Sequence, residues 1–242
     1  MEEYDDIAEK YSFREDPIRD YVSIPSFLEV LGNINGKTVL DVGCGSGFIT
    51  RKIKLLGAKK VVGIDISQEM IKLAIKTENE NPLGIKYFVK DIKKAGIIEE
   101  FDIITAGFLL HYSKNKNELK KMCKSIFGNL KEGGRFVTIN LNPDNPLSNN
   151  KKYGAIITGQ NPLKEGDKIK VTHFDENDNE IFSFYNFHWL RNTYEKALID
   201  SGFKQVKWYP MKVSAEGIKR FGDKYWKDYL SEPRLIIIEA VK

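Results

Sequence analysis

Long apolar runs and cysteines are both scarce in this sequence of 242 residues. No stretch reaches the roughly 18 consecutive apolar residues that a membrane-spanning helix needs. The N-terminal residues 1–7 are acidic and precede no apolar run, which excludes a secretory or transit peptide. Cys44 and Cys123 lie far apart and match neither a disulfide framework nor a zinc pattern. We therefore expect a cytoplasmic protein with two reduced thiols and no metal.

A large excess of one charge is also missing. Lys and Arg total 38 against 34 Asp and Glu, a net charge of +4. Many lysines stand in pairs among acids, which is typical of solvated faces and not of a stripe that follows phosphates. A nucleic-acid partner is therefore not indicated. The length, with 41% apolar residues, suits one α/β domain over residues 1–242.

Residues 37–140 alternate strand-like and helix-like patterns, which predicts a parallel sheet covered on both faces. Ser67 is placed to cap the second helix, and Gly133 with Gly134 to stop the third, which should span 117–130. We expect five strands here: 38–42, 60–64, 87–89, 101–105 and 135–139.

The alternation of strand-like and helix-like segments ends after Asn140, where prolines and asparagines prevent regular structure until about residue 152. Residues 168–174 and 181–187 alternate apolar and polar residues and predict a β-hairpin. A helix at 191–201 and strands at 203–209 and 235–241 should follow, separated by an aromatic-rich excursion over 210–233.

The first strand ends in the glycine-rich turn 43–47, which invites two interpretations. Such a turn holds the pyrophosphate of a dinucleotide in the G-x-G-x-x-G fingerprint of nicotinamide-dependent oxidoreductases. Here, however, Phe48 replaces the third glycine, and Asp41 precedes the turn. A carboxylate would repel a pyrophosphate but attract a ligand with an ammonium and a sulfonium. The charge favours S-adenosylmethionine, and Asp41 could otherwise only cap the turn.

Five segments in order resemble the motifs of class I S-adenosylmethionine-dependent methyltransferases. They are 39–48 (VLDVGCGSGF), 63–67 (GIDIS), 88–92 (FVKDI), 101–111 (FDIITAGFLLH) and 130–135 (LKEGGR). The resemblance implies a Rossmann-like, mostly parallel, seven-stranded sheet with an antiparallel last strand. It also implies contacts to the methionine end from Asp41, Gly43 and Gly45.

The same resemblance assigns the rest of the cofactor site. Asp65 would take both ribose hydroxyls, with Ile66 beside it. Asp91 and Ile92 would bracket the adenine, although Asp91 could merely start a turn. Ala106 would offer its backbone to the donor.

Further segments are similar to a narrower group, the toxoflavin-biosynthesis type of N-methyltransferase, which methylates azapteridine nitrogen. They are 4–11 (YDDIAEKY), 109–112 (LLHY), 194–198 (YEKAL), 213–218 (VSAEGI) and 221–226 (FGDKYW). We expect a lid from residues 1–30 and 142–190, with Tyr11 either in the core or in a flap over the donor.

The acceptor side offers a few candidate residues. His111 follows the carboxyl end of the fourth strand, where open α/β sheets bind ligands, and is the candidate catalytic residue, although histidines also cap loops. Tyr112, His188 and Trp189 are candidates for lining the substrate, against a plain packing role. Cys44 has no neighbouring base and should only fill a tight corner.

The sequence therefore predicts a methyltransferase that acts on a small molecule, at a ring nitrogen of a flat heterocycle. A neutral ring nitrogen needs no early deprotonation, so positioning would dominate catalysis. Methylation of oxygen stays open, as does a module that only senses the cofactor. RNA methylation is a further alternative, although Ala106-Gly-Phe-Leu109 stands where base-methylating enzymes carry an Asp or Asn, two prolines and an aromatic.

Overall fold

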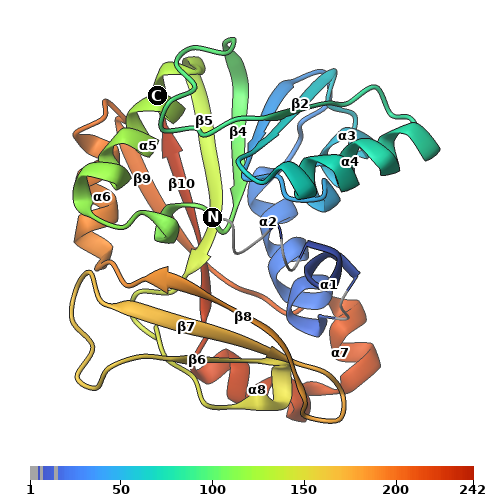
Figure 1. Cartoon of the computed structure of the whole chain (residues 1–242), viewed down its shortest axis with the longest axis vertical. Coiled ribbons are helices and arrows are strands. Elements are labelled where there is room, and N and C mark those ends of the chain that lie inside the picture. Colours follow the sequence, from blue (N-terminus) through green and yellow to red (C-terminus); the bar gives the residue numbers. More distant parts are fainter. Residues whose placement is uncertain (1–4, 6–7, 14–15) are drawn as a thin grey trace.

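The computed structural model describes residues 5, 8–13 and 16–242, with residues 11–13 described by their backbone alone. Its main element is a seven-stranded sheet in the order β3-β2-β1-β4-β5-β10-β9 (Figure 1). The strands are β1 (Thr38–Val42), β2 (Lys60–Asp65), β3 (Lys86–Val89), β4 (Phe101–Gly107), β5 (Leu130–Leu141), β9 (Gln205–Pro210) and β10 (Leu235–Val241).

The strand directions confirm the predicted fold. The strands β3, β2, β1, β4 and β5 pair in parallel, whereas β10 is antiparallel to both β5 and β9. In β1, alternate residues point to opposite faces, so Val39 and Leu40 belong to two different apolar clusters. Both faces of the sheet are therefore buried, as a parallel sheet requires.

Helices cover the two faces. On the Val39 side pack α2 (Ile24–Leu31), α3 (Phe48–Leu55), α4 (Gln68–Glu80) and α8 (Asp223–Ser231), and on the Leu40 side α5 (Lys116–Gly128) and α6 (Arg191–Ile199). Ser67 caps α4 as predicted, because its hydroxyl accepts a hydrogen bond from the Met70 N–H at 3.1 Å.

A second sheet of three antiparallel strands lies below the carboxyl ends of β4 and β5 (Figure 1). It contains β6 (Ala155–Thr158), β7 (Lys168–Phe174) and β8 (Glu180–Phe187). The hairpin β7–β8 confirms the prediction, whereas β6 was not expected from its four residues. An apolar face of Ile169, Val171 and Phe184 packs toward Tyr112 of the 3-10 turn η3 (Leu110–Tyr112).

Several boundaries differ from the prediction, among them the start of β5 at Leu130 instead of residue 135 and the end of α6 at Ile199 instead of Ser201. The helix α5 ends at Gly128 instead of Leu130, and Gly133 and Gly134 lie inside β5 and do not stop the helix. The excursion after β9 forms α7 (Ala215–Phe221) and α8, and Trp226 of α8 is fully buried. The shorter elements near the N-terminus are α1 (Ala8–Phe13) and the π-helix η2 (Arg19–Ser23), and η4 (Lys151–Tyr153) precedes β6.

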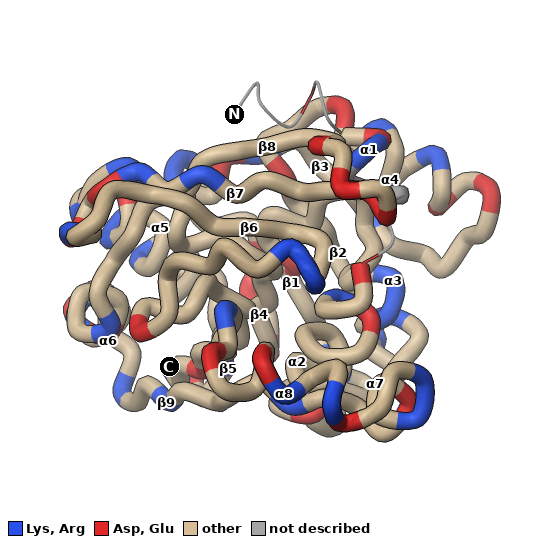
Figure 2. The backbone as a smooth tube through the Cα atoms, turned by 90° about the horizontal axis from the view of Figure 1, so that it is seen from below, with Lys and Arg blue, Asp and Glu red and all other residues tan. Residues whose placement is uncertain are grey.

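Among the described residues, no helix is long and apolar enough to cross a membrane, and no group of acids, histidines or cysteines suits a metal ion. Cys44 and Cys123 are both free and buried. Seen from below, basic and acidic positions are interspersed along the chain (Figure 2).

Candidate active site

The glycine turn after β1 is held open by Asp65 at the end of β2. Gly43 and Gly45 have φ values of 68° and 54°, which favour glycine. The Gly45 N–H donates to one Asp65 carboxylate oxygen at 2.8 Å, and the Ser67 N–H donates to the other at 2.9 Å. Burial raises the pKa of Asp65, while these N–H donors lower it. Because a carboxylate accepts about four hydrogen bonds, Asp65 can still bind hydroxyl groups.

Asp41 lies beneath the same turn and is 1% exposed. The hydroxyls of Thr50 and Thr105 donate to its two oxygens at 2.6 and 2.8 Å. Burial raises the pKa of Asp41 to about 6, against the lowering effect of the two hydroxyls, and the charge of Asp65 adds to the rise. Asp41 and Asp65 thus place two acidic groups at one turn, which suits a cationic ligand and not a phosphate.

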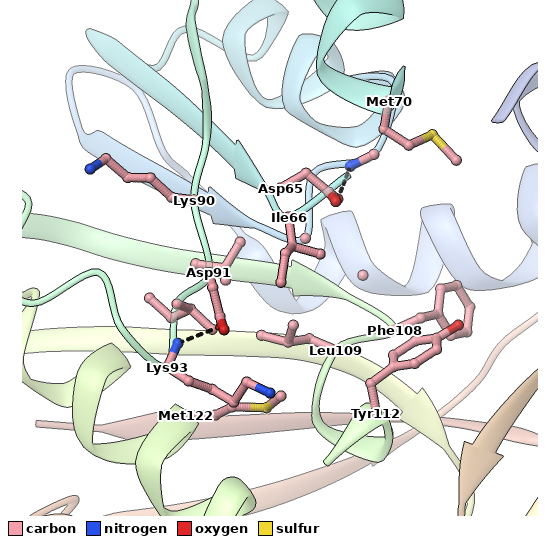
Figure 3. Close-up of a pocket in the computed structure, with 15 residues that line it drawn as sticks. Asp65, Ile66, Met70, Lys90, Asp91, Lys93, Phe108, Leu109, Tyr112 and Met122 are labelled. Atoms are coloured by element: carbon pink, nitrogen blue, oxygen red, sulfur yellow. Dashed lines mark hydrogen bonds between the residues drawn. The ribbon is translucent and has the colours of Figure 1, made fainter. Parts of the chain in front are cut away.

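A cavity of about 750 Å³ extends from the glycine turn past the ends of β2 and β4. Asp65, Ile66, Asp91 and Ile92 all line it, and Figure 3 shows Asp65, Ile66 and Asp91 with Leu109 around one space. The Asp91 carboxylate accepts the Lys93 N–H at 2.9 Å, which fixes the turn after β3. The structure therefore brings the predicted ribose and adenine residues together.

Ala106 takes a different position from its neighbours. It is fully buried in β4, pairs with Thr138 of β5, and does not line this cavity. The next residues, Gly107 and Phe108, line it instead. The predicted backbone contact from β4 is therefore better placed at these two residues.

Phe108 stands where three cavities meet. It lines the cavity just described, a second of about 610 Å³ and a third of about 730 Å³ that contains Asp41 and Gly43. Its φ of 64° is unusual for a residue with a Cβ, and its N–H donates to the Ile139 carbonyl at 2.9 Å. Such backbone conformations gather at functional sites. Phe108 is thus a shared wall between the cavity at the glycine turn and the second cavity.

The second cavity is the candidate acceptor site. Its walls come from η3, from the end of β5 and from all three strands of the small sheet, and they include Tyr112 and Phe184. Among the described residues, the buried polar atoms without a hydrogen-bond partner include His111 Nδ1, Asn186 Oδ1 and both side-chain polar atoms of Asn140. His111 and Asn186 line the cavity. Buried polar atoms normally have partners, so Asn186 Oδ1 is open to a ligand, whereas the side chains of His111 and Asn140 interact with each other.

His111 is 1% exposed, and its ring lies between Phe108 and Tyr112 at centroid distances of 6.1 and 5.0 Å. Burial lowers the pKa of His111 to about 3, although nearby Asn140 raises it. The imidazole is therefore neutral at physiological pH. It can accept a hydrogen bond but is a weak base for removing a proton.

The remaining candidates lie elsewhere. Trp189 is buried on the α5 side of the large sheet, and its indole N–H donates to the Ser113 carbonyl at 3.1 Å. His188 is 7% exposed and, like Trp189, lines none of the three cavities. Both residues follow β8 in a segment that packs against the rest of the protein. Their residue types alone could not show whether they line a cavity or pack in the core. The Tyr11 side chain lies outside the described residues.

Several lining residues were not predicted from the sequence, above all Phe108, Asn186 and Arg234. The position of Phe108 directly after Gly107, at the end of β4, was the available signal. Asn186 and Arg234 had none, because only the tertiary fold brings them to one cavity.

A family model described as "Methyltransferase domain" matches residues 39–134. A ribosomal protein L11 methyltransferase of Burkholderia multivorans is 38% identical over 101 residues, which are 42% of this chain and 31% of that protein. The match thus spans about a third of the length of that relative. An uncharacterized protein of Haemophilus influenzae is 27% identical over 98% of this chain and 95% of its own length.

Solved structures share the fold at low identity. The CcbJ methyltransferase from Streptomyces caelestis has a TM-score of 0.70 at 17% identity, covering 98% of this chain and 97% of its own. An S-adenosylmethionine-dependent methyltransferase from Clostridium acetobutylicum has a TM-score of 0.67 at 19% identity, with 98% of both chains covered. The acceptor cavity is built mostly from residues outside 39–134, the part that the family model covers.

Proposed function

We propose that the chain is a class I S-adenosylmethionine-dependent methyltransferase that methylates a ring nitrogen of a small, flat heterocycle, and the match of a methyltransferase family model to residues 39–134 supports the first part. The observation that carries this proposal is the second cavity, an aromatic-walled space that meets the glycine turn at Phe108.

The residues around the glycine turn fit S-adenosylmethionine, which supplies an activated methyl group when it is bound. Asp41 and Asp65 provide the negative charge, and Gly43 and Gly45 leave room beside the backbone. Asp65 would bind the ribose hydroxyls, and Ile66 and Ile92 would hold the adenine between apolar side chains.

The acceptor cavity supports positioning as the main source of catalysis. Tyr112 and Phe184 lie 6.4 Å apart between ring centroids, and flat rings stack on such faces at low entropic cost. The neutral His111 would orient the acceptor by a hydrogen bond. Since a neutral ring nitrogen carries a free electron pair, no general base is required.

The walls around the second cavity favour a small heterocycle over RNA as the acceptor. Tyr153, Ile157 and Phe184 come from three segments of the small-sheet region and wall the cavity. A base within an RNA strand would have to be extruded into this space. Among the described residues, the basic side chains also form many ion pairs with acids on the surface.

The test is a transfer assay with labelled S-adenosylmethionine. Pterin-like and purine-like heterocycles, phenols, carboxylic acids and total RNA should be compared, and the new methyl group located by NMR. We expect transfer to a heterocycle nitrogen at a rate that is flat between pH 6 and 8. Transfer to RNA alone, or to oxygen with a pH limb that depends on His111, would contradict the proposal.

A further inference from the structure

Arg234 is a buried cation in the wall of the acceptor cavity. It directly precedes β10 and is 7% exposed. Its guanidinium carries five N–H donors, and among the described residues it makes one hydrogen bond, from Nη1 to the Ala155 carbonyl. No carboxylate of the described chain lies within 4.0 Å of it. Most of its hydrogen-bonding capacity is therefore unused.

Arg135 offers a contrast on the neighbouring strand β5. Its side chain is 31% exposed, yet its guanidinium pairs with Glu239 at 2.7 Å and donates to the Leu31 carbonyl at 2.8 Å. The more exposed arginine thus has an acidic partner, whereas the buried one has none in the part of the chain that the structure describes. Burying a charge without a partner is costly, so Arg234 requires another explanation.

Two neighbours of Arg234 could compensate part of this cost. The rings of Tyr153 and Tyr229 lie 5.8 and 5.9 Å from the guanidinium carbon. Burial lowers the pKa of Arg234, while Tyr229 and Asp16 raise it. Asp16 acts from beyond ion-pair distance, and one of its oxygens accepts the Arg19 N–H at 2.9 Å. Neither tyrosine accepts a hydrogen bond from the guanidinium of Arg234.

The polar atoms of the cavity complete the pattern. Asn186 Oδ1 is buried, has no hydrogen-bond partner among the described residues and lines the same cavity as Arg234, and the neutral His111 lines it too. Aromatic faces lie between these polar groups. A ligand that fills the cavity would therefore meet the cation of Arg234 at one point, the carboxylate of Asp16 at another and neutral polar groups elsewhere.

We propose that Arg234 binds a negatively charged group of the methyl acceptor, namely a carboxylate or an ionised ring oxygen. This inference rests on the proposed function in that it takes the second cavity as the acceptor site. A planar guanidinium binds carboxylate oxygens through two parallel hydrogen bonds, which fixes the orientation of a flat molecule. Arg234 is then a specificity determinant that excludes uncharged heterocycles.

The test measures binding and requires no turnover. Wild-type protein with S-adenosylhomocysteine is titrated at pH 7.5 with matched probes that differ in charge. These are quinoline-2-carboxylate and its amide, pterin-6-carboxylate and its amide, and urate and hypoxanthine. We expect at least one anion to bind about tenfold or more tightly than its neutral partner.

Variants assign the effect to Arg234. R234Q should remove the preference by weakening the anion about tenfold and leaving the neutral probe within about twofold, and R234K should keep part of it. R135Q is the control, because it removes a charge near the same strand pair outside the cavity, and it should behave as wild type. Thermal unfolding of each variant checks that it is folded.

The outcomes separate the two proposals. If no anion binds more tightly than its neutral partner, or if R234Q weakens both members of a pair equally, the Arg234 proposal is wrong. Methyl transfer to a neutral heterocycle by wild type and R234Q alike would contradict the Arg234 proposal but would leave the proposed function standing. Anion binding that depends on Arg234, without any methyl transfer, would support the Arg234 proposal and contradict the proposed function.

Discussion

The two halves of the site are built in different ways. On the donor side, Asp41, Gly43, Gly45 and Asp65 come from two adjacent parallel strands and the turns that follow them. On the acceptor side, the walls combine segments that are more than two hundred residues apart, from Asp16 to Arg234. The first half is a local structure with a recognisable pattern, whereas the second exists only in the folded chain.

The halves also treat charge differently. The donor side holds two buried acids whose oxygens all accept hydrogen bonds from the protein. The acceptor side holds a neutral histidine, the carboxylate of Asp16 and, as far as the described residues show, an unpartnered amide oxygen of Asn186 and an arginine without an acidic partner within 4.0 Å. The donor half is thus organised before any ligand arrives, while the acceptor half leaves its polar groups for the ligand to satisfy.

The largest effect is expected from Asp65→Ala. The change removes two charge-assisted bonds to the ligand and the two contacts that hold the turn, so donor binding should weaken by about a hundredfold or more. Calorimetry with S-adenosylhomocysteine measures it. Asp175→Ala, which alters an acid in the β7–β8 turn, is the control. Unchanged affinity in Asp65→Ala would disprove the ribose assignment.

Asp41→Asn should change how stability depends on pH. The pKa of Asp41 is about 6 in the folded state, above the ordinary value of 3.8 for an aspartate, so the folded state binds more protons than the unfolded state between these pH values. Stability then falls as the pH rises from about 4 to 6, by up to ~3 kcal/mol. The variant should lack this fall, as urea unfolding at several pH values can determine.

Asp102→Asn provides a control of opposite sign. The Thr38 N–H and hydroxyl and the Lys131 ammonium lower the pKa of Asp102 to about 2 despite its partial burial. Its stabilising effect is present above about pH 4 and is lost as the pH falls toward 2. If Asp41→Asn and wild type respond alike between pH 4 and 6, Asp41 does not titrate as described.

His111→Gln should lower the rate of transfer by about tenfold to a hundredfold without changing the shape of the pH profile. The reason is that a histidine with a pKa of about 3 stays neutral from pH 5 upward. His188→Gln, at a buried histidine that lines none of the three cavities, should leave the rate near wild type. A pH limb that vanishes in His111→Gln would instead identify a general base.

The smallest effect is expected from Phe184→Leu. This change removes a flat face of the acceptor cavity but keeps most of the buried volume, so KM for the acceptor should rise by about fivefold to tenfold while donor binding is unchanged. Phe182→Leu is the matched control, because Phe182 is equally buried in the same sheet but does not line the cavity. Equal effects of both would indicate a packing role.

Much of the large sheet could be predicted because its signals are local. The strands 38–42 and 235–241 appear at the predicted residues, and Ser67 caps its helix. The hairpin was likewise visible in its alternation. The short strand β6 was missed because four residues carry too little pattern, and Gly133 misled because a glycine suits a bend within a strand as well as a helix end.

The donor residues were predictable for the same reason, since Asp65 and Asp91 directly follow their strands. The acceptor residues were not. Trp189 and His188 were aromatic candidates that tertiary packing turned away from the cavity, and Arg234 gave no sign of its burial in the sequence. Which of many polar or aromatic side chains faces a cavity depends on contacts across the whole chain.

A crystal structure with S-adenosylhomocysteine tests most directly that the two halves are separate and meet at Phe108. We predict electron density for the nucleoside between Asp65 and Asp91, with the amino acid part beside Gly43 and the second cavity still open between Tyr112 and Phe184. Density for the nucleoside in the second cavity, against His111 and Arg234, would contradict this assignment of donor and acceptor sites.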